Sequence, residues 1–234
     1  MSKIRIYSEN KIIKGQIILP HKHHIHYLKN VMRKKKDEKI FLFDKNSEWE
    51  CKINCKKKFN LLPLKLIRQK NLIPDIWICF GIVKTKNINN LIEKVSEIGV
   101  KKIVPMFTEF SMKLNNKIER LRKISIEAVE QSNAITIPEI SEIKPLADLL
   151  REWDKERLII FCDEKGGYPI LSANKLFKKF KKIAIFIGPV GGWSISDKNI
   201  IYEQEIFRVS LGNNILKADT AAIYSLSCLR ALME

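Results

Sequence analysis

The sequence contains no apolar run near the roughly 18 residues that a membrane-spanning helix requires, so we expect no membrane anchor. Its five cysteines, at positions 51, 55, 79, 162 and 228, are odd in number and lack paired C-x-x-C spacing. This pattern argues against a disulfide framework and against a zinc site. Residues 1–7 read as a β-strand and not as the apolar core of a signal peptide. These absences predict a cytoplasmic protein with reduced thiols.

Acidic residues are scarce relative to basic ones. The chain has 43 Lys and Arg against 26 Asp and Glu, which gives a net charge of +17 and a pI near 9.6. Such an excess favours a polyanionic partner, because each neutralised phosphate releases counterions. An AT-rich coding bias is the alternative, and it explains the preference for Lys over Arg better than it explains the uncompensated charge.

The first 70 residues have the pattern of a small β domain. Strand-like runs cover residues 14–19, 39–44, 48–57 and 62–68, and a short helix is expected near 23–32. Short strands at this spacing predict a small barrel over residues 1–70. Two basic clusters, at 33–36 and 56–58, are either solvated loops or phosphate contacts, and the positive charge of the chain favours the second interpretation.

Residues 74–234 alternate between strands and helices after a polar boundary at 69–75. We expect strands at 76–83, 103–107, 158–163, 183–187 and 207–210, and helices at 87–98, 116–132, 145–153, 172–180 and 218–233. Gly99 is expected to end the first helix as a left-handed cap. Apolar strands that alternate with helices predict an α/β domain whose parallel sheet is covered on both faces.

All four histidines lie at positions 21, 23, 24 and 26. A metal tract is conceivable, but no acidic or cysteine ligand accompanies them. The segment is therefore interpreted as a polar lead into the short helix, and no metal is expected.

Two glycine loops follow strands of the second domain, where open α/β sheets bind ligands. The first is Gly188-Pro189-Val190-Gly191-Gly192, which is neither the nicotinamide fingerprint G-x-G-x-x-G nor a P-loop. The second runs from Leu211 and Gly212 to Lys217, and a helix with Asp219 and Thr220 in its first turn follows. Each loop alone could be a structural turn or a helix start.

Together with other segments, the loops resemble the ribosomal RNA small-subunit methyltransferase E family of the SPOUT superfamily. The resemblance runs nearly end to end, in order. Its segments are Tyr27-Leu28 with Val31-Met32-Arg33, Asp37 and Leu42-Phe43-Asp44; Lys94 with Glu97-Ile98-Gly99-Val100, Pro105 and Thr108-Glu109-Phe110-Ser111; Arg120 with Glu127-Ala128, Glu130-Gln131-Ser132 and Pro138; and the two glycine loops.

The resemblance implies a PUA-like barrel over 1–70 and a SPOUT domain with a trefoil-knotted parallel sheet over 74–234. It implies a homodimer that methylates N3 of one uridine in 16S ribosomal RNA of the small ribosomal subunit. S-adenosylmethionine would be held by backbone groups of the two glycine loops, and the loop after residues 158–162 would close a third side. The implied cofactor-binding residues are Phe161, Cys162, Ile187, Gly188, Pro189, Gly191, Gly192, Leu211, Gly212, Ile215 and Leu216.

Catalysis of this reaction requires loss of the proton on N3, because protonated uridine nitrogen is a poor nucleophile. No histidine lies beyond position 26, so Asp219 is the candidate for proton removal or for positioning the base. Lys217 is the candidate for stabilising the anionic uracil or for holding phosphate, with Thr220 beside them. The residues expected to bind RNA are Arg33, Lys34, Lys35, Lys36, Lys84, Lys94 and Arg120.

The sequence departs from the family pattern near the implied site. Family members usually have Glu at Val190, Arg at Lys217, Glu at Asp219 and Arg at Ala134. Two alternatives to the hypothesis of an active enzyme therefore stay open. One is a non-catalytic RNA-binding or ribosome-assembly protein of the same fold. The other is a SPOUT methyltransferase with a different RNA target, since a target is recognised by surface shape and charge.

Overall fold

The computed structural model describes residues 3–55, 58–112 and 118–233, and it divides into two compact units. The small unit comprises Met1–Leu72 and Val129–Ile137, and the large unit comprises Ile73–Ala128 and Pro138–Glu234. Helix α3 (Ile118–Gln131) contributes to both units, because its last residues are counted with the small one. No helix in the described ranges is both long and apolar enough to cross a membrane.

The small unit contains a four-stranded sheet in the order β1-β2-β3-β4. Its strands are β1 (Arg5–Tyr7), β2 (Lys39–Phe43), β3 (Ser47–Asn54) and β4 (Asn60–Gln69). The helix α1 (Lys22–His26) and the π-helical turn η1 (Tyr27–Val31) lie between β1 and β2 in the chain. Strand β1 is parallel to β2, and the other pairs are antiparallel. Alternate side chains such as Ile40, Leu42 and Ile53 are fully buried and form the core.

The strand expected at residues 14–19 does not form. Only an isolated bridge between Ile18 and Leu61 joins this segment to the sheet. Gly15 has φ +76°, which turns the chain, and Ile17 and Leu19 are more than half exposed. Only Ile18 of the three apolar residues packs against the core of the small unit, so the segment lacks the alternate inward-facing side chains that would fix a strand register.

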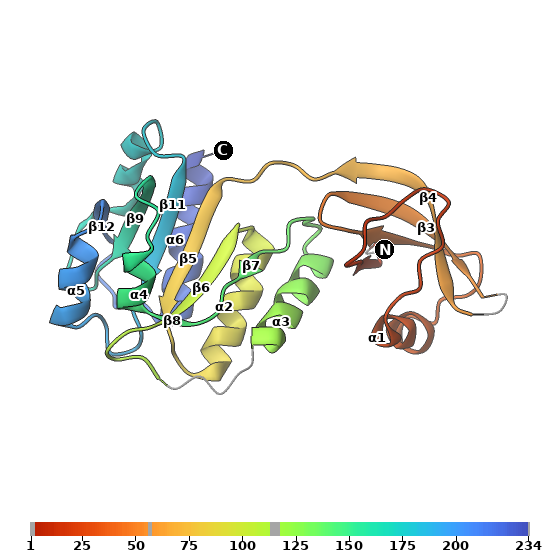
Figure 1. Ribbon diagram of the computed structural model, residues 1–234, viewed down its shortest axis with the longest axis horizontal. Helices are drawn as coiled ribbons and strands as arrows, with labels where there is room; N and C mark the ends of the chain where they lie inside the picture. The colour runs from red at the N-terminus through yellow and green to blue at the C-terminus, as the bar shows by residue number, and fades with distance from the viewer. Residues whose placement is uncertain (1–2, 56–57, 113–117, 234) are drawn as a thin grey trace. The chain divides into compact units, whose positions relative to one another are not determined.

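The large unit is built on a sheet with the strand order β10-β12-β9-β11-β5-β6-β7, and β8 pairs with β6 (Figure 1). The strands are β5 (Asp75–Gly81), β6 (Lys102–Phe107), β7 (Glu139–Ile140), β8 (Lys144–Pro145), β9 (Arg157–Cys162), β10 (Tyr168–Pro169), β11 (Lys182–Ile187) and β12 (Ile206–Ser210). All of these pairs are parallel. The α/β prediction is confirmed, although the order of the strands was not predicted.

Helices cover both faces of this sheet because buried side chains alternate between them. Ile183, Ile185 and Ile187 face the apolar cluster that includes helices α2 (Thr85–Ile98) and α6 (Ala218–Met233). Ala184 and Phe186 face the opposite cluster, which includes α4 (Leu146–Arg151) and α5 (Ile195–Tyr202).

Five elements of the large unit differ from the expectation, and three of them are the unpredicted two-residue strands β7, β8 and β10. The helix expected at 172–180 is a 3-10 helix, η2 (Ile170–Leu176). Helix α5 was not predicted, although Ser194 and Asp197 form a capping box at its start. Gly99 ends α2 as expected, but with φ +96° and ψ +107° it has a positive φ without the left-handed helical conformation that was predicted.

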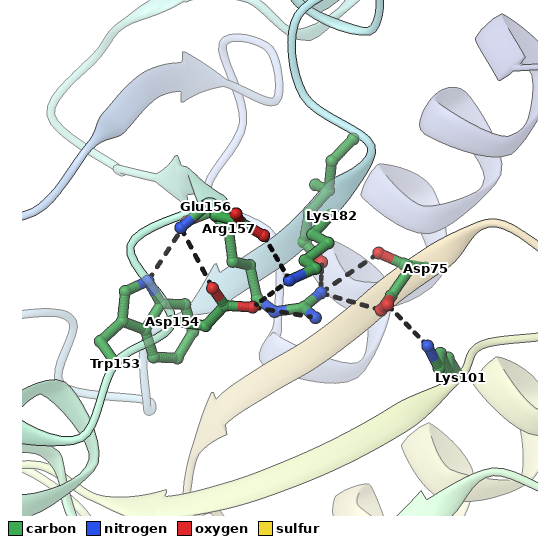
Figure 2. A network of polar contacts seen from close by, with 8 residues as sticks. Asp75, Lys101, Trp153, Asp154, Glu156, Arg157 and Lys182 are labelled. Atoms are coloured by element: carbon green, nitrogen blue, oxygen red, sulfur yellow. Dashed lines mark hydrogen bonds and ion pairs between the residues drawn. The ribbon is translucent and has the colours of Figure 1, made fainter.

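A charged network joins the first residues of three neighbouring strands, β5, β9 and β11 (Figure 2). The buried guanidinium of Arg157 donates from Nη1 to Asp75 Oδ1 at 2.9 Å and to the carbonyl oxygen of Ile183 at 3.2 Å. Lys182 Nζ lies 3.0 Å from Asp154 Oδ2, and Lys101 Nζ lies 2.6 Å from Asp75 Oδ2. The amino ends of the strands are therefore fixed by ion pairs, which leaves the carboxyl ends for a ligand.

Candidate functional site

A cavity of about 640 Å³ lies at the carboxyl ends of the parallel strands of the large unit. Its walls come from the loops after β9, β11 and β12, which are adjacent in the sheet, and from Lys84 and Asn87 at the start of α2. The volume falls within the ~300–1,000 Å³ range of small-molecule sites. Ligands of open α/β sheets bind at this edge.

The cavity brings together nearly all of the residues that the resemblance implied for cofactor binding. Those that line it are Cys162, Ile187, Gly188, Pro189, Gly191, Gly192, Leu211, Gly212, Ile215 and Leu216, and Lys217 joins them. Phe161 does not line the cavity. Successive strand residues point to opposite faces, so Phe161 packs against Trp193 in the opposite apolar cluster while Cys162 faces the site.

The turn after β11 is compact because its glycines allow close contacts. Gly192 has φ +72°, and its N–H donates to the carbonyl oxygen of Pro189 at 2.9 Å. A Cβ on Gly188 would lie 3.0 Å from Trp193 Nε1. That indole N–H donates to the carbonyl oxygen of Cys162 at 3.1 Å, which ties this turn to the end of β9.

The loop after β12 leads into helix α6. Gly212 has φ +114° and open space where a Cβ would stand. Lys217 is exposed at the cavity, and the small side chains of Ala218 and Ala221 line it from the first turn of α6. The backbone and apolar surfaces of this loop suit a flat aromatic ligand.

Asp219 and Thr220 belong to the first turn of α6, but neither lines the cavity. Asp219 Oδ2 accepts a hydrogen bond from Asn90 Nδ2 at 2.9 Å. The other carboxylate oxygen, Oδ1, is buried and has no hydrogen-bond partner in the described part of the chain. Thr220 is exposed.

Asp163, immediately after β9, is a cavity residue that the sequence reasoning missed. Its carboxylate is buried and lies 2.9 Å from Lys198 Nζ and 2.8 Å from Arg208 Nε. Burial alone would raise the pKa of Asp163, but the N–H of Lys165 and the cations of Lys198 and Arg208 hold it below its ordinary value. Asp163 is therefore an ionised anchor for the loop that follows.

Glu164 and Asn87 were missed as well, and both line the cavity. An acidic pair directly after the buried strand β9 was the available signal, because the carboxyl ends of neighbouring parallel strands meet at one edge. Cys162 is not a nucleophile at neutral pH, since burial raises the pKa of its thiol to about 12.

The residues predicted to bind RNA differ in their exposure and in their ion pairs. Arg33, Lys35, Lys36, Lys84 and Arg120 are exposed. Lys34 Nζ lies 3.1 Å from Glu38, and Lys94 Nζ lies 2.8 Å from Glu93 and 3.0 Å from Glu97. Hydrogen bonds from Lys94 to Glu93 and Glu97 raise the pKa of this amine. The cluster expected at 56–58 lies mostly outside the described residues.

The histidine segment forms α1, and its buried member makes a structural contact. His24 Nε2 lies 3.1 Å from Glu130 Oε1, which also accepts the N–H of Tyr7 at 2.7 Å. The described residues contain no group of three or more His, Cys, Asp or Glu side chains arranged to hold a metal ion.

Comparisons with known proteins give a consistent result. The sequence matches the RNA methyltransferase domain family over residues 69–230 and the RNA methyltransferase PUA domain family over residues 22–61. It is 30% identical to the ribosomal RNA small subunit methyltransferase E of Rickettsia conorii, over 97% of this chain and 95% of that protein.

Two solved structures share the fold. A ribosomal RNA small subunit methyltransferase E from Neisseria gonorrhoeae, bound to S-adenosyl methionine, gives a TM-score of 0.86 at 22% identity and covers 98% of each chain. A Legionella pneumophila protein in complex with the bound cofactor SAM gives a TM-score of 0.85 at 25% identity, over 99% of this chain and 98% of that one.

Proposed function

The chain belongs to the ribosomal RNA small subunit methyltransferase E family, and from this premise we propose that it transfers a methyl group from S-adenosylmethionine to RNA of the small ribosomal subunit. The finer proposal is that the acceptor is N3 of one uridine in 16S ribosomal RNA. The observation that carries the proposal is the cavity formed by both glycine loops at the carboxyl ends of β9, β11 and β12.

The residues that line the cavity have the chemical groups that S-adenosylmethionine requires. Backbone groups and the apolar side chains of Ile187, Leu211 and Leu216 suit the adenine ring, and the open space at Gly212 allows close approach to the main chain. Lys84, Glu164 and Lys217 are charged groups for the polar parts of the molecule. The cofactor supplies an electrophilic methyl on a sulfonium, so the chain's task is to position the acceptor in line with it.

Lys217 is proposed to stabilise the uracil as it becomes anionic, since its ammonium extends from the loop after β12 and lines the cavity. Asp219 is proposed to take the proton from N3, with Thr220 beside it. Asn90 donates to Oδ2 of Asp219, and Oδ1 is buried outside the cavity, so this role requires the first turn of α6 to become accessible to the acceptor base.

Uridine N3 lies on the pairing edge of the base, so the target must be unpaired or turned out of a stack. We propose that residues 1–70 form the RNA-binding domain and that residues 74–234 form the catalytic domain. Exposed Arg33, Lys35 and Lys36 of the first and Lys84 and Arg120 of the second would contact phosphates.

We also propose a homodimer that acts in the cytoplasm. Val190, Ile195 and Ile215 are apolar and between 76% and 84% exposed, although two of them belong to the loops that form the cavity. Burial against a second copy would remove this apolar surface from water. Light scattering after size-exclusion chromatography would give twice the 27.3 kDa chain mass if this is correct.

The test of the function uses purified protein, methyl-labelled S-adenosylmethionine and unmodified small ribosomal subunits. Label that enters the RNA supports the proposal. RNA that binds without label would instead favour a non-catalytic RNA-binding protein. Label that enters transfer RNA in preference to the subunit would favour a methyltransferase with another target.

A further inference from the structure

Glu164 lines the cavity with its carboxylate largely free. The side chain of its neighbour Asp163 is fully buried and already paired within the protein: Oδ1 accepts hydrogen bonds from Lys165 N and Lys198 Nζ, and Oδ2 lies 2.8 Å from Arg208 Nε in an ion pair. Glu164, in contrast, lies 4.0 Å from Lys198 Nζ, and 29% of its side chain is exposed. Among the described residues, Asp163 and Glu164 are the acidic side chains that line the cavity. Glu164 is therefore the carboxylate that a ligand can use.

The loop holds Glu164 in place without using its carboxylate. The N–H of Asp163 donates to the carbonyl oxygen of Val209 at 3.1 Å, and the N–H of Gly166 donates to the carbonyl oxygen of Asp163 at 3.2 Å. With the buried Asp163 side chain paired to cations, the backbone on both sides of Glu164 is fixed. A side chain on a fixed backbone loses less conformational entropy when it binds a ligand.

The glycine turn confines the carboxylate from the other side. A Cβ built on Gly192 would lie 2.8 Å from Glu164 Oε1 and 3.5 Å from Oε2. The missing side chain at Gly192 thus provides the room in which the Glu164 carboxylate lies.

We propose that Glu164 is a specificity residue that accepts hydrogen bonds from the two adjacent ribose hydroxyls of the methyl donor, an inference that rests on the proposed function. A carboxylate has two acceptor oxygens, which match a vicinal diol, and an acidic residue binds ribose hydroxyls in the same way in dinucleotide folds.

The charged amino-acid end of the donor belongs elsewhere in the cavity. Its carboxylate requires a cation, and two described lysines line the cavity. Lys217 is proposed to face the uracil, which leaves Lys84 in the loop after β5. Strand β11 separates β5 from β9, which places these strands roughly 10 Å apart at the usual spacing of about 4.8 Å per strand. The donor's ammonium shares a carbon with its carboxylate and therefore stays near Lys84, not near Glu164.

The test measures ligand binding by calorimetry on the full-length chain and on Glu164→Ala and Glu164→Gln. The probes are S-adenosylhomocysteine, methylthioadenosine, which keeps the ribose but lacks the amino-acid end, and the dideoxyribose analogue of methylthioadenosine. Glu203→Gln is the matched control, because Glu203 is an exposed acid that does not line the cavity.

Removal of Glu164 should weaken S-adenosylhomocysteine and methylthioadenosine alike, by about 10- to 100-fold, which is the size expected for hydrogen bonds to a charged group. The dideoxyribose analogue should bind the wild type more weakly by a similar factor. For the Glu164→Ala variant, the dideoxyribose analogue and methylthioadenosine should have nearly equal affinities. A merely structural role would not produce this coupling between the side chain and the hydroxyls.

Two results would overturn the inference. One is unchanged affinity in both Glu164 variants, and the other is a loss restricted to S-adenosylhomocysteine, which would place Glu164 at the amino-acid end. A wild type that binds none of the nucleosides would refute the proposed function itself, so the two failures are distinguishable.

Discussion

At the scale of single residues, Gly192 and Gly15 have almost the same backbone torsion, with φ +72° and +76°, but different surroundings. Gly15 has no atom within 4 Å of a built Cβ, whereas Gly192 has the Glu164 carboxylate there. Replacement by alanine imposes a similar left-handed strain at both positions, of about 1–2 kcal/mol. Only at Gly192 does it also displace a cavity side chain.

We therefore expect Gly192→Ala and Gly15→Ala to lower the free energy of unfolding by similar amounts, while only Gly192→Ala weakens nucleoside binding. The effect should not add to that of Glu164→Ala, because both changes remove the same carboxylate from its place. Urea unfolding and calorimetry measure the two quantities. Equal nucleoside affinity in the two glycine variants would contradict this account.

The proposed catalytic residues give a second prediction at this scale. Lys217→Ala should lower kcat by about 100- to 1,000-fold, as expected for loss of one electrostatic contact to a developing anion. Asp219→Asn should lower it by about 100- to 10,000-fold through loss of the proton acceptor. Lys175→Ala, an exposed lysine in η2, is the control. Full activity in both site variants would show that neither role is correct.

Much of the cavity was predictable from the sequence, because two glycine loops after apolar strands indicate an unusual backbone where ligands bind. The acids at 163 and 164 were missed because an acidic pair after a strand has no motif of its own. Phe161 was grouped with Cys162 by their adjacency in sequence, but the alternation of side chains along β9 separates them.

At the scale of secondary structure, the strands and helices with strong apolar patterns were predicted to within a few residues. Helix α6 runs from Ala218 to Met233 as expected. Helix α5 was missed because its eight residues show little amphipathic pattern, and its start depends on the capping box of Ser194 and Asp197. The segment at 14–19 was overpredicted because only Ile18 of its three consecutive apolar residues packs against the core.

The network around Arg157 predicts a large effect on stability. Its side chain is 3% exposed and its guanidinium lies 3.8 Å from the centre of the Trp77 ring. Arg157→Met removes the hydrogen bonds to Asp75 and to the carbonyl oxygen of Ile183, while Asp75 keeps Lys101 as its cation. We therefore expect the free energy of unfolding to fall by about 1–3 kcal/mol. Arg151→Met is the control, since Arg151 is 75% exposed and should change stability by less than about 1 kcal/mol.

Denaturant titration of the two variants tests this expectation. A loss in Arg157→Met no larger than in Arg151→Met would show that the network contributes little to the strand ends.

The same network predicts sensitivity to acid. Burial would raise the pKa of Asp75, but hydrogen bonds from Arg157 and Lys101 bring it below its ordinary value. A folded-state pKa below the unfolded one means that the unfolded chain binds more protons, so stability is present above about pH 4 and is lost as pH falls through the folded pKa.

Asp75→Asn should therefore lower stability at pH 7 and flatten its decline below about pH 4. Asp148→Asn, which removes a 45%-exposed surface carboxylate, should leave the decline unchanged. Unfolding curves measured at several pH values give the decline in stability of each variant in acid. An equally steep acid decline in Asp75→Asn would contradict the assignment.

At the scale of the whole molecule, the fold class was predicted correctly. The parallel α/β sheet is present, and the PUA domain match covers residues 22–61. The order of the strands could not be predicted, because periodicity shows which residues are buried and not which strands are neighbours. The trefoil knot, the homodimer and the two domain boundaries stay predictions.

The charge of +17 predicts a strong dependence of RNA binding on salt. Alanine at Arg33, Lys35 and Lys36 should reduce the slope of log affinity against log salt by about 2, at roughly 0.7 per phosphate contact on single-stranded RNA. Alanine at exposed Lys178, Lys179 and Lys181 removes the same charge elsewhere and should leave the slope unchanged. Equal slopes for the two triple variants would indicate non-specific attraction by net charge.

The most direct test of the central claim is mass spectrometry of nucleosides from 16S ribosomal RNA after incubation of unmodified small subunits with the protein and labelled S-adenosylmethionine. Label is expected in 3-methyluridine at a single position, and none is expected when the protein is omitted. Label in another methylated nucleoside would refute the assignment of uridine N3. The absence of label despite tight RNA binding would refute the assignment of methyl transfer.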